Sequence, residues 1–255
     1  MSRRILPWLG ALLLLLVGLA ARLSDLQDLP LDFHPTRQLH SAVIARGLYY
    51  ADLTSVPDWQ RQRAVEYGRL EGLVEPQIVE TLSAWGYRLA GSEQLWIPRA
   101  LSIAFWCLGG LALFLFARRH FSGGAALFAL GFYFALPYGV IASRAFQPDP
   151  LMTALILWAL YALDGYLESP TWPRLLAAGL VGGLAIFIKT TAIFFIGPLF
   201  LAGVLWRYGR GFWRAGRVWA LAALCLLPFA AYWVWGTWID GSLAGQTAMR
   251  FFPQY

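Results

Sequence analysis

Two cations stand out among the side chains that could do chemistry, because each lies at the end of a long apolar segment. Arg144 comes shortly before Pro150, where an apolar segment begins. An arginine beside a helix N-terminus makes an anion site, and its planar fork suits a phosphate. Lys189 is the only lysine in the chain and lies in a turn between two apolar segments. These positions indicate a site for an anionic ligand.

The neighbours of these cations have structural interpretations as well. Asp149 followed by Pro150 fits a helix N-cap with proline at the first helical position. His34 and Arg37, after the first apolar segment, could orient a helix or touch a substrate. The polar residues nevertheless converge on one side of the apolar segments, which favours a common site.

The composition excludes a soluble globular protein. Of 255 residues, 59% are hydrophobic and 13% are charged, whereas soluble proteins have about 25% charged residues. The thirteen tryptophans suit a membrane–water interface. The net charge of +6 does not predict a nucleic-acid partner, because the arginines are scattered between apolar blocks, so anionic lipid is the expected partner. Cys107 and Cys225 lie in apolar runs and indicate neither a disulfide nor a zinc site.

Apolar segments long enough to approach a membrane crossing predict the architecture, since a crossing needs about 20 apolar residues. The seven segments are 5–23, 99–117, 123–142, 150–167, 175–188, 192–206 and 218–238. Arginine and lysine are enriched in cytoplasmic loops. Counted over the short loops and the termini, with a cytoplasmic N-terminus, nine of them lie inside and three outside; the inside set is Arg3, Arg4, Arg118, Arg119, Arg174, Arg207, Arg210, Arg214 and Arg217, and the outside set is Arg144, Lys189 and Arg250. The loop 24–98 and the C-terminus are then expected outside.

The loop 24–98 contains two segments with the pattern of amphipathic helices. In 36–51 and 75–91, apolar and aromatic residues recur at three- and four-residue spacing. Pro76 in the first turn and Gly91 after the last periodic residue mark the expected ends of the second helix. Both helices are expected to lie on the outer membrane surface.

The turn at Lys189 is expected to be recessed below that surface. The stretch from Arg174 to Arg207 is only 34 residues long, whereas two full crossings with a turn need about 40 residues. A recessed lysine needs an anionic partner, which a ligand phosphate or Asp149 could supply. Alternatively, the side chain could extend back to the interface.

Three stretches together resemble a known family. At Asp32–Arg37, at Glu75–Pro76 and at Ser143–Asp149, the sequence resembles GT-C glycosyltransferases, and more narrowly the family 39 group that contains protein O-mannosyltransferases and the lipid A aminoarabinose transferase. The resemblance covers about residues 5–238. Two departures bear on substrate choice. Phe33 and His34 follow Asp32 where the group has an Asp–Glu pair, and Glu75-Pro76-Gln77 replaces His-Pro-Pro.

The resemblance implies an all-α integral membrane protein with about seven transmembrane helices and two amphipathic juxtamembrane helices. Residues 1–238 would form the GT-C-like module, with its first extracytoplasmic loop at 24–98. Residues 239–255 would be an extracytoplasmic segment that begins a further region, because family members are about twice as long.

The resemblance also implies a reaction and a site. A sugar would pass from a polyprenyl-phosphate donor to an extracytoplasmic acceptor, protein, lipid or glycan, with inversion at the anomeric carbon. Asp32 would be the general base, and Arg144, Lys189 and Arg37 would bind the donor phosphate, with His34, Glu75 and Asp149 in support. The absence of a glycine-rich nucleotide motif agrees with a lipid-linked donor. A divalent metal near Asp32, Glu75 and His34 remains open.

Two other functions compete with the transferase. A non-catalytic lipid-binding or scaffold protein is favoured by the missing second acid and the short chain. A transporter or channel would need charges deep within several spans, and the sequence has almost none there. The distance between Asp32 and Arg144 distinguishes the transferase from the scaffold.

Overall fold

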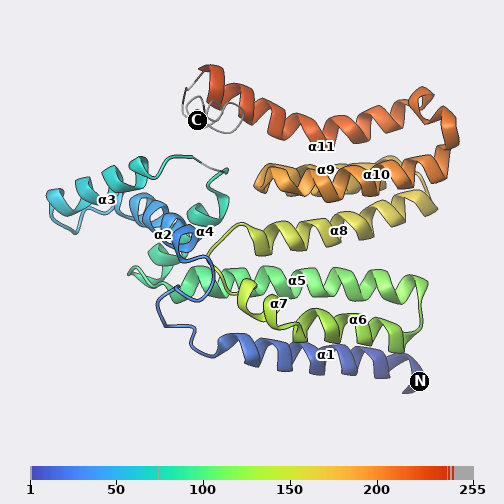
Figure 1. Ribbon diagram of the computed structural model, residues 1–255, viewed down its shortest axis with the longest axis horizontal. Coiled ribbons are helices and arrows are strands. Elements are labelled where there is room, and N and C mark those ends of the chain that lie inside the picture. The colour runs from blue at the N-terminus through green and yellow to red at the C-terminus, as the bar shows by residue number, and fades with distance from the viewer. Residues whose placement is uncertain (1, 74, 240, 242, 244–255) are drawn as a thin grey trace, which may run out of the picture.

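The computed structural model describes residues 2–73, 75–239, 241 and 243, and its regular structure is entirely helical in this part of the chain. The long helices are α1 (Ser2–Leu23), α5 (Trp96–His120), α6 (Gly123–Ala135), α8 (Asp149–Glu168), α9 (Trp172–Ile188), α10 (Ile193–Tyr208) and α11 (Gly216–Val234). Figure 1 shows them along the long axis of the molecule, with successive helices in opposite directions. The expected all-α membrane fold is confirmed.

The apolar composition of these helices accounts for their arrangement. Five stretches, which include α1, α5, α8, α10 and α11, are long and apolar enough to cross a membrane, while α6 and α9 are shorter apolar helices. The leucines on one face of α1 remain exposed, as expected of a face that contacts lipid. The chain is therefore an integral membrane protein. Each of the seven predicted segments is largely helical, but their number as crossings stays a prediction.

The third predicted segment, 123–142, is not one continuous helix. It divides into α6 and the short helix α7 (Pro137–Ala142), with Leu136 between them. Proline lacks the N–H that a helix interior requires, so Pro137 ends one helix and begins the next. In the last turn of α6, the carbonyl of Phe134 accepts a hydrogen bond from Arg22 Nη1 at 3.1 Å.

Three helices, rather than the two expected, occupy the loop between α1 and α5. The predicted segments 36–51 and 75–91 correspond to α2 (Pro35–Tyr50) and α4 (Ile78–Ala90). Gly91 ends α4 in a left-handed conformation, as predicted, whereas Pro76 lies outside the helix, because α4 begins at Ile78. The additional helix α3 (Asp58–Leu70) buries only Ala64 among its residues, so it lacks the apolar stripe by which a helix is predicted.

The helices divide the charged residues between two ends of the bundle. The loop end carries α2, α3 and α4, together with the connections at 143–148 and 189–192 (Figure 1). The opposite end, called the arginine end here, carries Arg118, Arg119, Arg174, Arg207, Arg210, Arg214 and Arg217. This division matches the grouping that the sequence predicts. Arg250 and nearly all of the expected C-terminal segment 239–255 lie outside the described residues.

Candidate active site

The segment between α7 and α8 is fixed by a separate hydrogen bond at each of five consecutive residues. Two of these residues accept: Ser143 Oγ accepts from Arg22 Nε at 2.7 Å, and Ala145 O accepts from Ser102 Oγ at 2.8 Å. The other three donate: Arg144 Nη2 to Asp32 Oδ2 at 2.9 Å, Phe146 N to Gln38 Oε1 at 2.9 Å, and Gln147 Nε2 to Phe33 O at 3.4 Å. These partners come from α1, α2, α5 and the loop after α1. The segment therefore joins elements that are far apart in the sequence.

Asp32 lies at the centre of this arrangement. Arg144 reaches its carboxylate with Nε at 3.1 Å and Nη2 at 2.9 Å, and Arg99 reaches it with Nη2 at 3.4 Å. All three contacts are made to Oδ2, so Oδ1 accepts no hydrogen bond from the described residues. The side chain is 29% exposed. Two guanidinium groups thus orient the carboxylate and leave one oxygen available to take a proton.

Arg99 fixes the path of the loop that carries Asp32. Its side chain is 1% exposed, and Nη1 donates to the carbonyls of Asp25, Leu26 and Asp28 at 3.2, 3.3 and 2.8 Å. The sequence analysis did not identify this residue. The sequence does mark Arg99, because a charged residue in the first turn of an apolar segment is costly unless it has a partner.

Gln38 is a second positioning residue that the sequence analysis missed. It is fully buried on α2, and its Nε2 donates to the carbonyls of Phe33 at 2.6 Å and Pro30 at 3.2 Å. Its Oε1 accepts from Phe146 N. A single amide thereby joins the Asp32 loop to the segment after α7.

His34 adopts an unusual backbone conformation between that loop and α2. Its φ of 46° and ψ of 64° are left-handed, and Pro35 follows as the first residue of α2. Non-glycine residues seldom adopt this conformation, and they persist there where the surrounding structure determines it. The imidazole makes no cap hydrogen bond; it lines a cavity instead.

A polar cavity of about 320 Å³ opens at the loop end beside Asp32. Its lining residues come from the loop after α1, from α2, α5, α7 and α8, from the segment between α7 and α8, and from the turn after α9; they are Phe33, His34, Arg37, Trp106, Tyr138, Ala142, Gln147, Asp149, Pro150, Thr153 and Lys189. Four of the predicted site residues, His34, Arg37, Asp149 and Lys189, are thus brought together. Asp32, Glu75 and Arg144 do not line the cavity, although Phe33 and His34 connect it to Asp32.

Lys189 has a carboxylate partner in this cavity. Nζ lies 2.8 Å from both carboxylate oxygens of Asp149. The predicted N-cap role of Asp149 is wrong: Asp149 is the first residue of α8, Pro148 is the N-cap, and no side chain caps the helix. Because the carboxylate points to Lys189, it stabilises the ammonium and leaves one N–H for another acceptor.

Arg37 is the second cation that lines the cavity. Its Nη2 is 2.6 Å from Glu75 Oε2, while Nε and Nη1 make no hydrogen bond to the described residues. Around the site, the cations Arg37, Arg99, Arg144 and Lys189 face the carboxylates Asp32, Glu75 and Asp149. Among the residues that line the cavity, the two cations Arg37 and Lys189 accompany one carboxylate, Asp149. The lining therefore keeps one positive charge, which favours an anionic ligand.

A metal ion near Asp32, Glu75 and His34 would require that these side chains be free to bind it. Asp32 is bound by Arg144 and Arg99, and Glu75 is bound by Arg37. No group of three or more His, Cys, Asp or Glu side chains among the described residues could hold a metal ion. The three residues therefore do not fit a common metal ion.

A bundle of apolar helices with a polar cavity at one end is the architecture of an integral membrane protein with a candidate site at that end. The dolichyl-phosphate-mannose-protein mannosyltransferase family matches residues 75–235, more than half of the chain. The chain belongs to this family and is a membrane glycosyltransferase of the GT-C type. The match includes Glu75, Arg144, Asp149 and Lys189 but begins after Asp32. No curated protein and no solved structure matches the chain.

Proposed function

We propose that this glycosyltransferase moves a sugar from a polyprenyl-phosphate donor to an extracytoplasmic acceptor, with inversion at the anomeric carbon. The observation that carries the proposal is the polar cavity lined by Lys189 and Arg37, which Phe33 and His34 connect to Asp32, a carboxylate that two arginines hold in place. A cationic cavity next to an oriented carboxylate suits a reaction that needs both a base and a neutralised leaving group.

Each participant has a defined part in the transfer. Asp32 Oδ1 takes the proton of the acceptor hydroxyl while the hydroxyl oxygen forms a bond to the anomeric carbon. The bond from that carbon to the phosphate oxygen breaks on the opposite face, and the polyprenyl phosphate leaves with the electron pair. A single displacement of this kind inverts the anomeric configuration.

Lys189 and Arg37 are the residues best placed for the departing phosphate, because both line the cavity and both retain free N–H groups. Arg144 was predicted to contact the phosphate as well. Its Nε, Nη1 and Nη2 are directed to Asp32 and to the carbonyl of Ser24. We therefore assign Arg144 first to positioning Asp32.

The proposed orientation places the loop end outside the cytoplasm. It rests on the nine-to-three distribution of cations in the short loops and termini, which favours a cytoplasmic arginine end and a cytoplasmic N-terminus. A lipid-linked donor is then the appropriate sugar source, because the site lies beside the membrane and the sequence has no nucleotide-binding loop.

Deletion of the gene in its source organism tests the proposal. Mass spectrometry of extracted lipids should show one polyprenyl-phosphate sugar accumulating, and the accumulating species identifies the donor. Complementation with the Asp28→Asn variant should reverse the accumulation, because the Asp28 side chain is exposed. Complementation with Asp32→Asn should not. Unchanged lipid-linked sugars would contradict the donor assignment, and full rescue by Asp32→Asn would favour the non-catalytic scaffold.

A further inference from the structure

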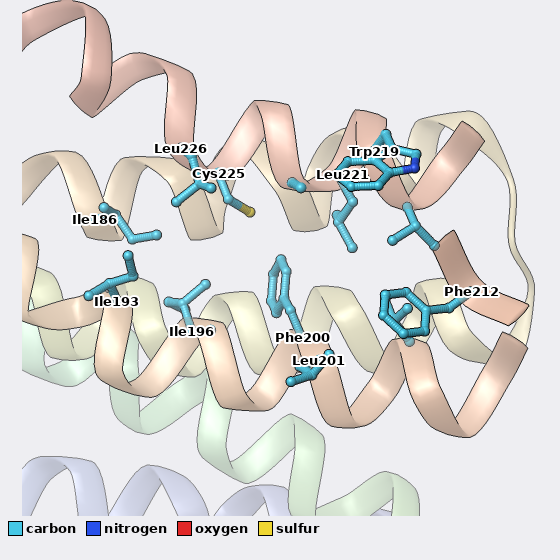
Figure 2. A pocket seen from close by; sticks show the side chains of 14 residues that line it. Ile186, Ile193, Ile196, Phe200, Leu201, Phe212, Trp219, Leu221, Cys225 and Leu226 are labelled. Carbon is cyan, nitrogen blue, oxygen red and sulfur yellow. The ribbon is translucent and has the colours of Figure 1, made fainter. Parts of the chain in front are cut away.

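A second pocket lies between α10 and α11, with α9 contributing Ile186. Its volume is about 230 Å³, and its lining is apolar apart from the indole nitrogen of Trp219 and the Cys225 thiol. Figure 2 shows Phe200 pointing from α10 towards α11, with Ile186 and Ile193 near one end and Phe212 and Trp219 near the other. It shares no lining residue with the polar cavity. This pocket, called the α10–α11 crevice here, is therefore a separate site.

The length of the crevice corresponds to one leaflet of a membrane. Along α10, its lining extends from Ile193 to Val204, which is about 16 Å at the rise of an α-helix. The hydrocarbon core of a bilayer is about 30 Å thick. One end of the crevice lies at the arginine end, where α11 begins and Trp219 lines it, and the other reaches Ile193, the first residue of α10. It therefore suits a lipid acyl chain that enters from the membrane leaflet at the arginine end.

The turn that closes this end of the crevice also presents arginines. Phe212 of the crevice belongs to the 3-10 turn Gly209–Arg214. Trp219 Nε1 donates to Trp213 O at 2.8 Å, and Trp213 Nε1 donates to Arg210 O at 3.1 Å. The Arg214 guanidinium lies 5.0 Å from the centre of the Trp213 ring. This set of contacts joins the lining of the crevice directly to the arginines.

Three of these arginines have no anionic partner among the described residues. Arg207, Arg210 and Arg214 are exposed, and none forms an ion pair within the described part of the chain. Arg119, at the same end, instead binds Asp164 at 2.7 Å. The indoles of Trp206, Trp213 and Trp219 are also exposed. Arginine and tryptophan together are typical of the level of lipid head groups.

We propose that the α10–α11 crevice binds one anionic phospholipid from the leaflet at the arginine end, the cytoplasmic leaflet in the proposed orientation. The phosphate contacts Arg210 and Arg214, with Arg207 nearby, and an acyl chain lies along Phe200 in the crevice. The proposal depends on the membrane setting and is independent of the transfer chemistry. A polyprenyl-phosphate donor is the competing occupant, because the crevice reaches Ile193, four residues after Lys189. Its phosphate would lie at the loop end and would not contact Arg210 and Arg214.

Two kinds of variant separate the parts of this site. Arg210→Gln with Arg214→Gln removes the head-group charge. Gly197→Leu fills the crevice, because a Cβ at Gly197 would meet no heavy atom within 4 Å. Arg63→Gln with Arg69→Gln is the matched control, since it removes two exposed arginines that have no ion pair among the described residues, at the loop end.

The test is native mass spectrometry of the purified, delipidated full chain titrated with phosphatidylglycerol or phosphatidylcholine in detergent. The wild type should bind one phosphatidylglycerol in preference to phosphatidylcholine. The double variant Arg210→Gln/Arg214→Gln should lower phosphatidylglycerol affinity about 30-fold, the effect of two arginines near an anionic surface. Gly197→Leu should weaken the binding of both lipids, and the Arg63/Arg69 control should match the wild type.

Three results would overturn the proposal. Equal affinity of the wild type for the two lipids would remove the head-group assignment. Equal losses in the Arg210/Arg214 variant and in the Arg63/Arg69 control would show that the attraction is not local. Displacement of one bound phosphatidylglycerol by one short-chain polyprenyl phosphate, abolished by Gly197→Leu, would assign the crevice to the donor instead.

Discussion

At the loop end, each cation of the candidate site faces a carboxylate, whereas Arg207, Arg210 and Arg214 at the arginine end face none among the described residues. Pairing holds a side chain in one geometry before a ligand arrives, and this preorganisation is what chemistry requires. An unpaired, exposed arginine remains available to an anion in the membrane. The comparison predicts that loop-end substitutions affect turnover or stability, while those at Arg207, Arg210 and Arg214 affect lipid binding.

The largest effect is expected at Asp32. Asp32→Asn should lower turnover by about 10²- to 10⁴-fold, because an amide cannot accept the acceptor's proton but can still accept the arginine hydrogen bonds. Donor binding and expression should remain close to those of the wild type. The measurement is turnover of the purified protein with its identified donor, and Asp28→Asn is the control. Near-normal turnover would exclude Asp32 as the base.

Arg99 should have the next largest effect, on stability rather than on chemistry. Arg99→Met leaves the loop carbonyls and Asp32 without their buried partner, and breaking such a buried pair costs about 3–5 kcal/mol. The midpoint of unfolding in detergent should fall accordingly. Arg63→Met, at an exposed position, should change stability by at most about 0.5 kcal/mol. Similar midpoints for the two variants would contradict the structural role of Arg99.

The ion pair between Lys189 and Asp149 differs from that of Arg99 in being partly exposed. The Lys189 side chain is 20% exposed and the Asp149 side chain 36%. Lys189→Met should weaken polyprenyl-phosphate binding by about 1.5–3 kcal/mol, the range of a charge-assisted hydrogen bond. Stability of the ligand-free protein should change by about 1 kcal/mol or less. Arg88→Met, which breaks the exposed pair with Asp52, is the control. A loss of stability without loss of donor affinity would make the pair purely structural.

Glu80 on α4 differs from the carboxylates of the candidate site, because the side chain that contacts it is a hydroxyl, Ser41 Oγ at 2.7 Å. Burial raises the pKa of the Glu80 carboxyl above its ordinary 4.5, and Glu75 adds to the rise, while Ser41 and His40 oppose it. Because the pKa of Glu80 is higher in the folded than in the unfolded state, the folded protein holds this proton more tightly. The contribution of Glu80 to the free energy of unfolding is therefore fully present below pH 4.5 and falls as the pH rises towards the folded pKa.

The corresponding prediction is that Glu80→Gln removes this component of the pH dependence. The thermal midpoint of the wild type should fall more steeply above pH 4.5 than that of the variant. Glu66→Gln, at an exposed position on α3, should keep the wild-type slope. Parallel pH profiles for the wild type and Glu80→Gln would show that burial of this carboxyl does not affect folding.

The smallest effect on stability is expected at the arginine end. Arg210→Gln with Arg214→Gln should change the free energy of unfolding of the delipidated protein by at most about 0.5 kcal/mol per residue, because neither arginine has an ion-pair partner to lose within the described residues. Chemical unfolding in detergent measures it. A loss of unfolding free energy comparable to that of Arg99→Met would show that the arginines of the two ends do not differ in their structural role.

The sequence predicts the spans well because lipid imposes a strong requirement on them. Runs of apolar residues must form helices to satisfy their backbone hydrogen bonds, so 99–117 and 150–167 correspond closely to α5 and α8. The helix α3 could not be predicted in the same way. It is polar on most of its surface, and it is positioned by a close approach of Gly68 to Gly47 on α2, which depends on tertiary packing.

The candidate site was predicted in its residue types but only partly in its pairs. Arg144, Asp149 and Lys189 were identified because charges at the ends of apolar segments are conspicuous. Which carboxylate meets which cation depends on the lateral order of the helices, and no periodicity encodes that order. Arg99 and Gln38 were missed because each acts on backbone carbonyls of a loop whose path is known only from the structure.

The buried hydrogen bond between Arg22 and Ser143 has a consequence for how the protein is made. The two residues are 121 positions apart, and synthesis at about 5–20 residues per second separates their appearance by roughly 6–24 s. During that interval, the guanidinium at the end of α1 lacks both Ser143 and the carbonyl of Phe134. Until then, the carbonyl of Gly18 in its own helix is the acceptor already present, and the guanidinium acquires its final neighbours only after Ser143 has been synthesised.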